Sequence, residues 1–190
     1  MSETSLTEQD LAGGYDLLAR TPQVLRALLA GMPAHWLDAT EGPGTWSPRI
    51  IVAHLLYCER ANWMPRAHTI REQGGTVPFP PFTPDGHFHA RYTANGDGPA
   101  LADAPLDALL ASFTTERAQH LAVLESWQLT SHDLTREGLH PAFGTVTLGQ
   151  LLAAWVAHDL SHIAQVTRVL ARQYRDVVGP WRKMMPLLDR

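Results

Sequence analysis

Apolar residues recur at spacings of three and four along four long segments of the chain, which is the period of a helix with one buried face. The pattern predicts helices over residues 7–29, 48–65, 105–127 and 147–174. The predicted starts carry capping residues: Thr7 is followed three residues later by Asp10, Ser47 precedes Pro48, and Thr147 opens the last segment.

Proline and glycine interrupt the pattern. Pro22 lies inside the first segment and has no N–H to donate, so we expect that helix to kink or divide near residue 20. Residues 74–100 combine many prolines and glycines with four aromatic residues, which predicts an ordered crossover packed over one end of the fold. Residues 130–146 form another loop, with a short extended piece at 145–147 and no strand hairpin.

These elements predict an all-α protein. Four helices with one long connection, between the second and the third, are typical of a four-helix bundle. The length of 190 residues suits a single domain, which we expect to span residues 1–190.

Composition excludes several classes of function. The residues are 45% hydrophobic and 18% charged, which is too apolar for a disordered chain. The formal net charge of −4 argues against general nucleic-acid binding. One cysteine allows no intrachain disulfide, and neither a signal pattern nor an apolar run of membrane-spanning length occurs. We therefore expect a cytoplasmic protein that binds neither nucleic acid nor membrane.

Three of the ten histidines have the placement of metal ligands. His158 and His162 are four residues apart on the last predicted helix, so their side chains share one face, and apolar neighbours indicate that this face looks inward. His54 lies among apolar residues of the second predicted helix, where an unpaired imidazole is costly to bury. Three neutral imidazoles suit Zn²⁺, Ni²⁺, Co²⁺ or Fe²⁺, with Zn²⁺ or Ni²⁺ favoured here, and leave positions open for water and substrate.

Other interpretations of these residues stay open. The run 158–162 resembles the His-Glu-x-x-His motif of zinc peptidases with Asp159 in place of Glu, but no third ligand follows at the usual spacing. The histidines could instead be core residues of a helical interaction module. Cys58 could be a fourth ligand or a reactive thiol, although a lone inward cysteine is more often a small apolar side chain. Glu59 is expected to pair with an arginine or to support a metal ligand from behind, and Asp159 to orient another helix, to cap a loop or to contact an imidazole N–H.

Four short motifs, specific only in combination, are spread along the chain. They are Trp46-Ser47-Pro48, His54-Leu55 with Glu59-Arg60, the segment from Gly144 to Thr147, and the run from His158 to Gln165. Together they resemble the DinB-like (YfiT-like) superfamily of metal-binding four-helix bundles, over about residues 14–181. The resemblance implies that His54, His158 and His162 hold the metal.

The resemblance also implies a function. Members of the superfamily are similar to thiol-dependent transferases and isomerases that use low-molecular-weight thiols. We therefore expect a metal-dependent transferase or hydrolase that acts on a small molecule, with such a thiol as a candidate cosubstrate and the general base unknown. The alternative is a metal- or small-molecule-binding stress-response protein without turnover. A homodimer stays open, because an exposed apolar helix face can be paired in that way.

Overall fold

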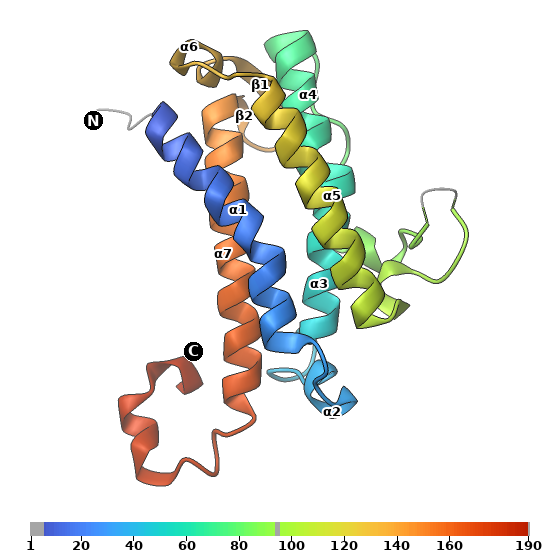
Figure 1. The fold of residues 1–190 in the computed structure, drawn as a ribbon, viewed down its shortest axis with the longest axis vertical. Coiled ribbons are helices and arrows are strands. Elements are labelled where there is room, and N and C mark those ends of the chain that lie inside the picture. Colours follow the sequence, from blue (N-terminus) through green and yellow to red (C-terminus); the bar gives the residue numbers. More distant parts are fainter. Residues whose placement is uncertain (1–5, 94–95, 190) are drawn as a thin grey trace.

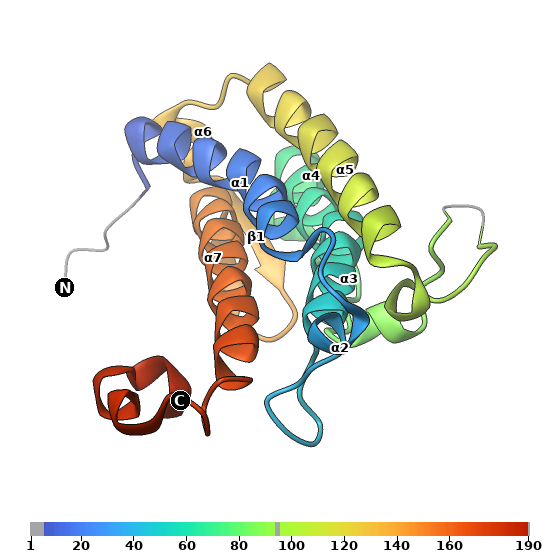
Figure 2. The same cartoon turned by 60° about the horizontal axis from the view of Figure 1, so that its bottom comes forward.

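The computed structural model describes residues 6–93 and 96–189, and its long helices form a four-helix bundle. The bundle consists of α1 (Glu8–Leu29), α3 (Pro48–Cys58) with its continuation α4 (Met64–Gln73), α5 (Leu106–Ser126) and α7 (Leu148–Arg172). Helix α1 packs against α5 and α7, and α3 packs against the same two helices (Figure 1, Figure 2). The predicted fold class is confirmed.

The predicted caps are present at the helix starts. Thr7 and Asp10 form a capping box at α1, and Thr147 and Gln150 form one at α7. The hydroxyl of Ser47 accepts a backbone hydrogen bond at the start of α3. These local signals fix the first residues of three of the four long helices.

The bundle has two apolar clusters with a polar layer between them. One cluster includes Leu18, Leu124 and Trp155, and the other includes Leu25 and Phe113. Buried or half-buried polar residues lie between the two clusters on α1, α5 and α7, and two more lie on α3 and just after it, where one cluster gives way to the other: Thr21, Arg117, His158, Asp159 and His162, with His54 and Glu59. Since buried polar groups need partners, this layer is where chemistry is expected.

Helix α3 passes into α4 through one π-helical turn, η1 (Glu59–Trp63). An α turn takes about 3.6 residues, so residues four apart along an α-helix shift gradually around the helix axis. A π turn takes more residues and compensates for this shift, so residues four apart stay on one face. Cys58, Asn62 and Arg66 are accordingly all buried, with 1%, 5% and 8% of their surfaces exposed. The π turn therefore places polar side chains in a row along the interior.

Pro22 does not divide the first helix, which was one of the two outcomes predicted for it. Helix α1 is continuous from Glu8 to Leu29, with Pro22 inside it. A proline at this position leaves the carbonyl of Leu18 without its helical N–H partner. Nη1 of Arg117, on α5, donates to that carbonyl at 2.7 Å. The vacant bond is thus replaced by a tertiary one, and the helix continues.

The crossover between α4 and α5 is ordered in its described part, with short turns η2 (Gly74–Thr76), η3 (Gly86–Phe88) and η4 (Leu101–Asp103). It does not cover one end of the bundle as predicted. Helices α4 and α5 point the same way, so the connection returns along the flank of α3 (Figure 1). The packing is close at Gly86, where a Cβ atom would lie 2.2 Å from the Tyr57 ring.

The expectation of no hairpin is also wrong. Strands β1 (Glu137–His140) and β2 (Gly144–Thr147) pair antiparallel, with His140 opposite Gly144. Gly144 has a φ of +72°, which favours glycine at the end of a tight three-residue loop. Strands of four residues are too short to show a clear alternation, so the sequence pattern does not reveal them.

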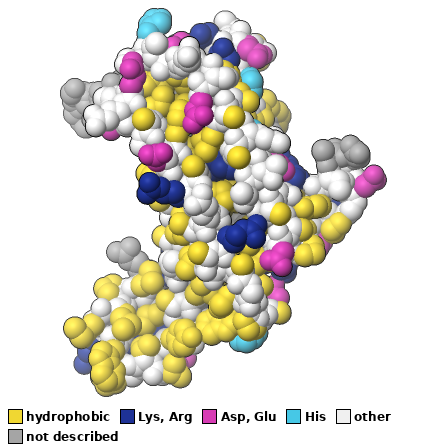
Figure 3. All heavy atoms as spheres, in the orientation of Figure 1, with side chains coloured by type: hydrophobic (Ala, Val, Ile, Leu, Met, Phe, Trp, Pro, Cys, Tyr) yellow, Lys and Arg dark blue, Asp and Glu magenta, His cyan; other side chains and the backbone are white. Residues whose placement is uncertain are grey.

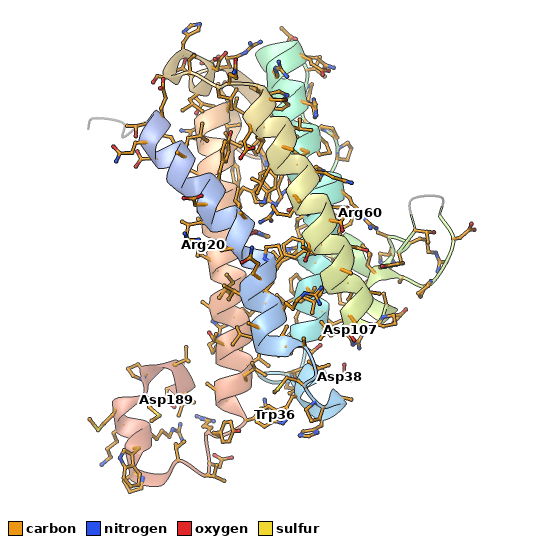
Figure 4. The ribbon with its side chains drawn as sticks, in the orientation of Figure 1. Arg20, Trp36, Asp38, Arg60, Asp107 and Asp189 are labelled. Carbon is orange, nitrogen blue, oxygen red and sulfur yellow. The ribbon has the colours of Figure 1, made fainter. Side chains whose placement is uncertain are left out.

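The C-terminal segment lies beside the lower end of α7 (Figure 1). It contains the turns η5 (Gly179–Met184) and η6 (Pro186–Asp189). Asp189, labelled in Figure 4, pairs with Arg182. Hydrophobic side chains dominate its surface in Figure 3, and Trp181 is 65% exposed. In the part of the chain that the structure describes, no helix is both long and apolar enough to cross a membrane.

Candidate metal centre

Three histidine side chains meet in the polar layer. His54 comes from the middle of α3, and His158 and His162 come from successive turns of α7. The Nε2 atom of His158 lies 3.2 Å from Nε2 of His54 and 3.2 Å from Nε2 of His162. The three donor atoms all lie within 4.8 Å of one another. The structure thus brings together the residues singled out from the sequence, and their role as ligands stays a prediction.

Hydrogen bonds at the other ring nitrogen set the protonation of two of the rings. Nδ1 of His54 lies 3.1 Å from the carbonyl oxygen of Pro84, and Nδ1 of His162 lies 2.8 Å from Oε1 of Gln165. Because these oxygens only accept, each Nδ1 carries the proton, and each Nε2 keeps a free lone pair. This is the arrangement in which histidine binds a metal.

The separations of Nε2 of His158 from the other two Nε2 atoms fit ligands of one common ion. Nitrogen ligands about 2.1 Å from one ion are about 3.0 Å apart at right angles and about 3.4 Å apart at the tetrahedral angle. The observed separations of 3.2 Å fall between these values. Among the described residues, Nδ1 of His158 and Oδ1 of Asp159 have no hydrogen-bond partner, and the two atoms lie 3.9 Å apart. A proton on that Nδ1, facing the carboxylate, gives His158 the same free Nε2.

Burial favours the neutral rings. Burial, reinforced by the charges of neighbouring histidines, lowers the pKa of His54 to about 3 and the pKa of His162 to about 4. Both side chains are therefore unprotonated at neutral pH, the form in which imidazole acts as a ligand.

Aromatic side chains enclose the triad. The Trp46 ring centroid is 4.7 Å from that of His54 and 6.2 Å from that of His162. Trp63 meets His158 edge-on at 5.1 Å, and the buried His87 meets Trp46 edge-on at 4.8 Å. These rings limit the access of water to the three nitrogen atoms.

Cys58 lies beside the triad without joining it. Its Sγ is 3.4 Å from Nε2 of His54. Burial raises the pKa of the Cys58 thiol above its ordinary value, so it stays protonated. Among the residues that the structure describes, the group of convergent donor atoms contains only the three histidines. A buried, protonated thiol fits the interpretation of Cys58 as a small apolar side chain.

Comparisons with known proteins identify the family. The sequence matches the DinB superfamily over residues 17–166, most of its length. The chain belongs to the DinB superfamily. This DinB protein is similar in structure to YfiT from Bacillus subtilis, with a TM-score of 0.74, 20% sequence identity, and coverage of 91% of this chain and 93% of that chain. YfiT is described as a probable metal-dependent hydrolase with an unusual four-helix bundle topology, and at this identity the likeness shows the fold alone. No curated protein matches the sequence.

This DinB-superfamily chain also has a buried ion-pair network whose pairing is not visible in the sequence pattern. Arg117, on α5, donates from Nη2 to Oε1 of Glu59 at 2.6 Å and from Nη1 to Oδ2 of Asp159 at 2.7 Å. Nδ1 of His120 lies 2.8 Å from the other oxygen of Glu59. Glu59 thus pairs with an arginine and Asp159 contacts another helix, in each case one of the roles expected for it. The sequence does contain one sign of this network, which is that Arg117 lies within the apolar stripe of the third predicted helix.

The charges of this network suit a cation at the triad. Two buried carboxylates, on Glu59 and Asp159, face one buried guanidinium. Burial alone raises the pKa of Asp159, but the neighbouring His158 imidazole and the charge and hydrogen bond of Arg117 hold that pKa below its ordinary value. Asp159 is therefore ionised next to His158, and a negative charge there favours a bound cation.

Gln165 and three further histidines differ in their surroundings. Gln165 orients His162 by its hydrogen bond. His89 and His132 are exposed and lie outside the triad. His140 lies 3.2 Å from Arg66, in a separate polar group.

Proposed function

We propose that the chain is a metal-dependent enzyme that acts on a small molecule, with His54, His158 and His162 holding a divalent transition metal, Zn²⁺ or Ni²⁺. The observation that carries the proposal is the convergence of three Nε2 atoms, two of them fixed as lone-pair donors by Pro84 and Gln165. Membership of the DinB superfamily supports it, as does the description of YfiT.

The chemistry follows from a ligand set of three. A divalent ion held by three imidazoles has open positions, and when bound it supplies Lewis acidity that lowers the pKa of a water or a thiol. The residues of the chain prepare this site: Pro84 and Gln165 orient two rings, and Asp159 faces the third. Trp46 and Trp63 shield the rings from bulk water. The reaction class we propose is transfer to or from a low-molecular-weight thiol, or hydrolysis.

Elemental analysis of the untagged protein tests the metal. We expect one equivalent of a transition metal in the wild type and its loss in His54→Ala and in His158→Ala. His132→Ala is the matched control, because His132 is exposed and lies outside the triad. Retention of metal in both triad variants, or no metal in the wild type after incubation with Zn²⁺ and Ni²⁺, would overturn the proposal.

A second measurement separates the classes of function. Co²⁺-loaded protein is titrated with a low-molecular-weight thiol while the visible spectrum of cobalt is followed. A saturable spectral change supports an open site that accepts a thiol. An unchanged spectrum with metal still bound would instead favour hydrolysis or a binding protein without turnover, and would exclude the thiol-dependent transfer.

A further inference from the structure

Arg66 is a buried cation without a counter-ion in the part of the chain that the structure describes. It lies on α4, in the row of polar residues that the π turn directs inward, and 8% of its surface is exposed. Within residues 6–93 and 96–189 its guanidinium has no carboxylate at ion-pair distance, and its Nε has no hydrogen-bond partner. A buried guanidinium without an anion is unfavourable. The position therefore favours binding of an anion.

The polar neighbour of Arg66 is a second hydrogen-bond donor. Nδ1 of His140 accepts from the backbone N–H of Ala142 at 3.1 Å and of Phe143 at 3.2 Å, so that nitrogen is unprotonated. Burial and the Arg66 charge lower the pKa of His140, which keeps the ring neutral with its proton on Nε2. This Nε2 lies 3.2 Å from Nη1 of Arg66, which also only donates. The N–H groups of Arg66 Nη1 and His140 Nε2 therefore lie side by side, and each needs a hydrogen-bond acceptor.

Aromatic rings surround the two donors. The guanidinium carbon of Arg66 lies 5.4 Å from the ring centroids of both Phe79 and Phe82. Phe143 stacks on His140 with centroids 4.4 Å apart, and Phe143 is 78% exposed. The donors are therefore flanked by apolar surface that reaches solvent at the hairpin turn.

We propose that Arg66 and His140 bind the carboxylate of a small molecule whose apolar part packs against Phe79, Phe82 and Phe143. A planar carboxylate offers two acceptor oxygens to the guanidinium fork and to the imidazole N–H. One guanidinium balances the single charge of a carboxylate, whereas a dianionic phosphate would keep an unbalanced charge in apolar surroundings. The site needs no metal, so it goes beyond the proposed function.

Benzoate is the probe that tests this proposal, because it combines one carboxylate with an aromatic ring. The full chain, labelled with ¹⁵N-arginine, is titrated with sodium benzoate at constant ionic strength while the arginine Nε–H signals are followed by NMR. We expect a saturable shift of the Arg66 signal, both in metal-free and in metal-loaded protein. Benzyl alcohol, which lacks the charge, is expected to leave the signal in place.

Matched variants locate the site. Arg66→Met is expected to weaken benzoate binding by about tenfold or more, the range for loss of a charged hydrogen-bond donor. His140→Ala, in the hairpin turn, provides a second test if Arg66→Met does not fold. Arg168→Met is the control, because Arg168 already pairs with Glu41. Absence of a saturable Arg66 shift, unchanged benzoate affinity in His140→Ala, or equal binding of benzyl alcohol would overturn the proposal. None of these readouts depends on the metal, so failure here is distinguishable from failure of the proposed function.

Discussion

Replacing Arg117 with methionine removes the centre of the buried network while preserving much of the side-chain volume. In the wild type Arg117 is 1% exposed, and its guanidinium bonds Glu59, Asp159 and the carbonyl of Leu18. The substitution leaves both carboxylates buried without their cation, and the Leu18 carbonyl without its donor. Leaving these three groups buried without partners destabilises the fold, because water does not replace the lost ion pairs and hydrogen bond.

Loss of one partner from a buried ion pair typically costs about 3–5 kcal/mol in the free energy of unfolding. A useful reference is Arg60, which lies on the flank of the bundle (Figure 4) and pairs with Glu116 at 2.5 Å, with 27% and 22% of the two side chains exposed. A partly exposed pair contributes about 0–1 kcal/mol. In a chain of this length 1 kcal/mol moves Tm by about 2–4 °C, so Arg117→Met is expected to lower Tm by about 6–20 °C.

Urea unfolding followed by far-ultraviolet circular dichroism, with thermal scans in parallel, measures both variants. Arg117→Met should lose several times the free energy that Arg60→Met loses. Equal small losses, below about 1 kcal/mol in each, would refute the reasoning, because they would show that the buried carboxylates find other partners or water when the guanidinium is gone.

Three further predictions follow from separate features. Gly138→Ala should destabilise the fold by about 1–3 kcal/mol in urea unfolding, because the new Cβ would lie 2.6 Å from core side chains, whereas Gly75→Ala, whose Cβ would have its nearest neighbour at 3.7 Å, should change little. Burial raises the pKa of Tyr15 to about 12, so the folded state favours the neutral phenol. The folding stability that depends on the neutral phenol is present below about pH 10 and is lost as the pH rises towards 12. Tyr15→Phe should abolish this alkaline loss of stability. Since the hydroxyl has no hydrogen-bond partner among the residues described, the substitution should not destabilise the protein at pH 7, and a loss above about 1 kcal/mol would contradict this. Asp159→Asn should weaken metal binding by about 10–100-fold in chelator competition, because Asp159 faces His158, and unchanged affinity would exclude that role.

Local signals in the sequence account for much of the fold. The capping residues Thr7 and Thr147 act through neighbours three residues away, so the start of a helix is visible in the sequence itself. His158 and His162 share a face because of helical geometry alone, and His54 stands out as polar among apolar residues. The convergence of their Nε2 atoms follows from how α3 and α7 pack. Whether they hold a metal stays a prediction.

Features that depend on distant partners were not predictable in the same way. The hairpin strands have four residues each, and their pairing requires knowledge of the turn between them. The π turn over Glu59–Trp63 has no simple sequence signature. The role of Arg117 requires knowing that α5 faces both Glu59 and Asp159, and the pairing of Arg66 with His140 requires the hairpin to be in place.

Pro22 makes the middle of α1 dependent on a residue far away in the chain. The carbonyl of Leu18 receives its hydrogen bond from Arg117, 99 positions later, instead of from its own helix. Helix–coil propagation along α1 is therefore incomplete until α5 docks, since the proline removes the bond that local growth would form. The assembly of α1 is tied in this way to a contact of high sequence separation, which favours cooperative folding of the bundle over stepwise addition of preformed helices.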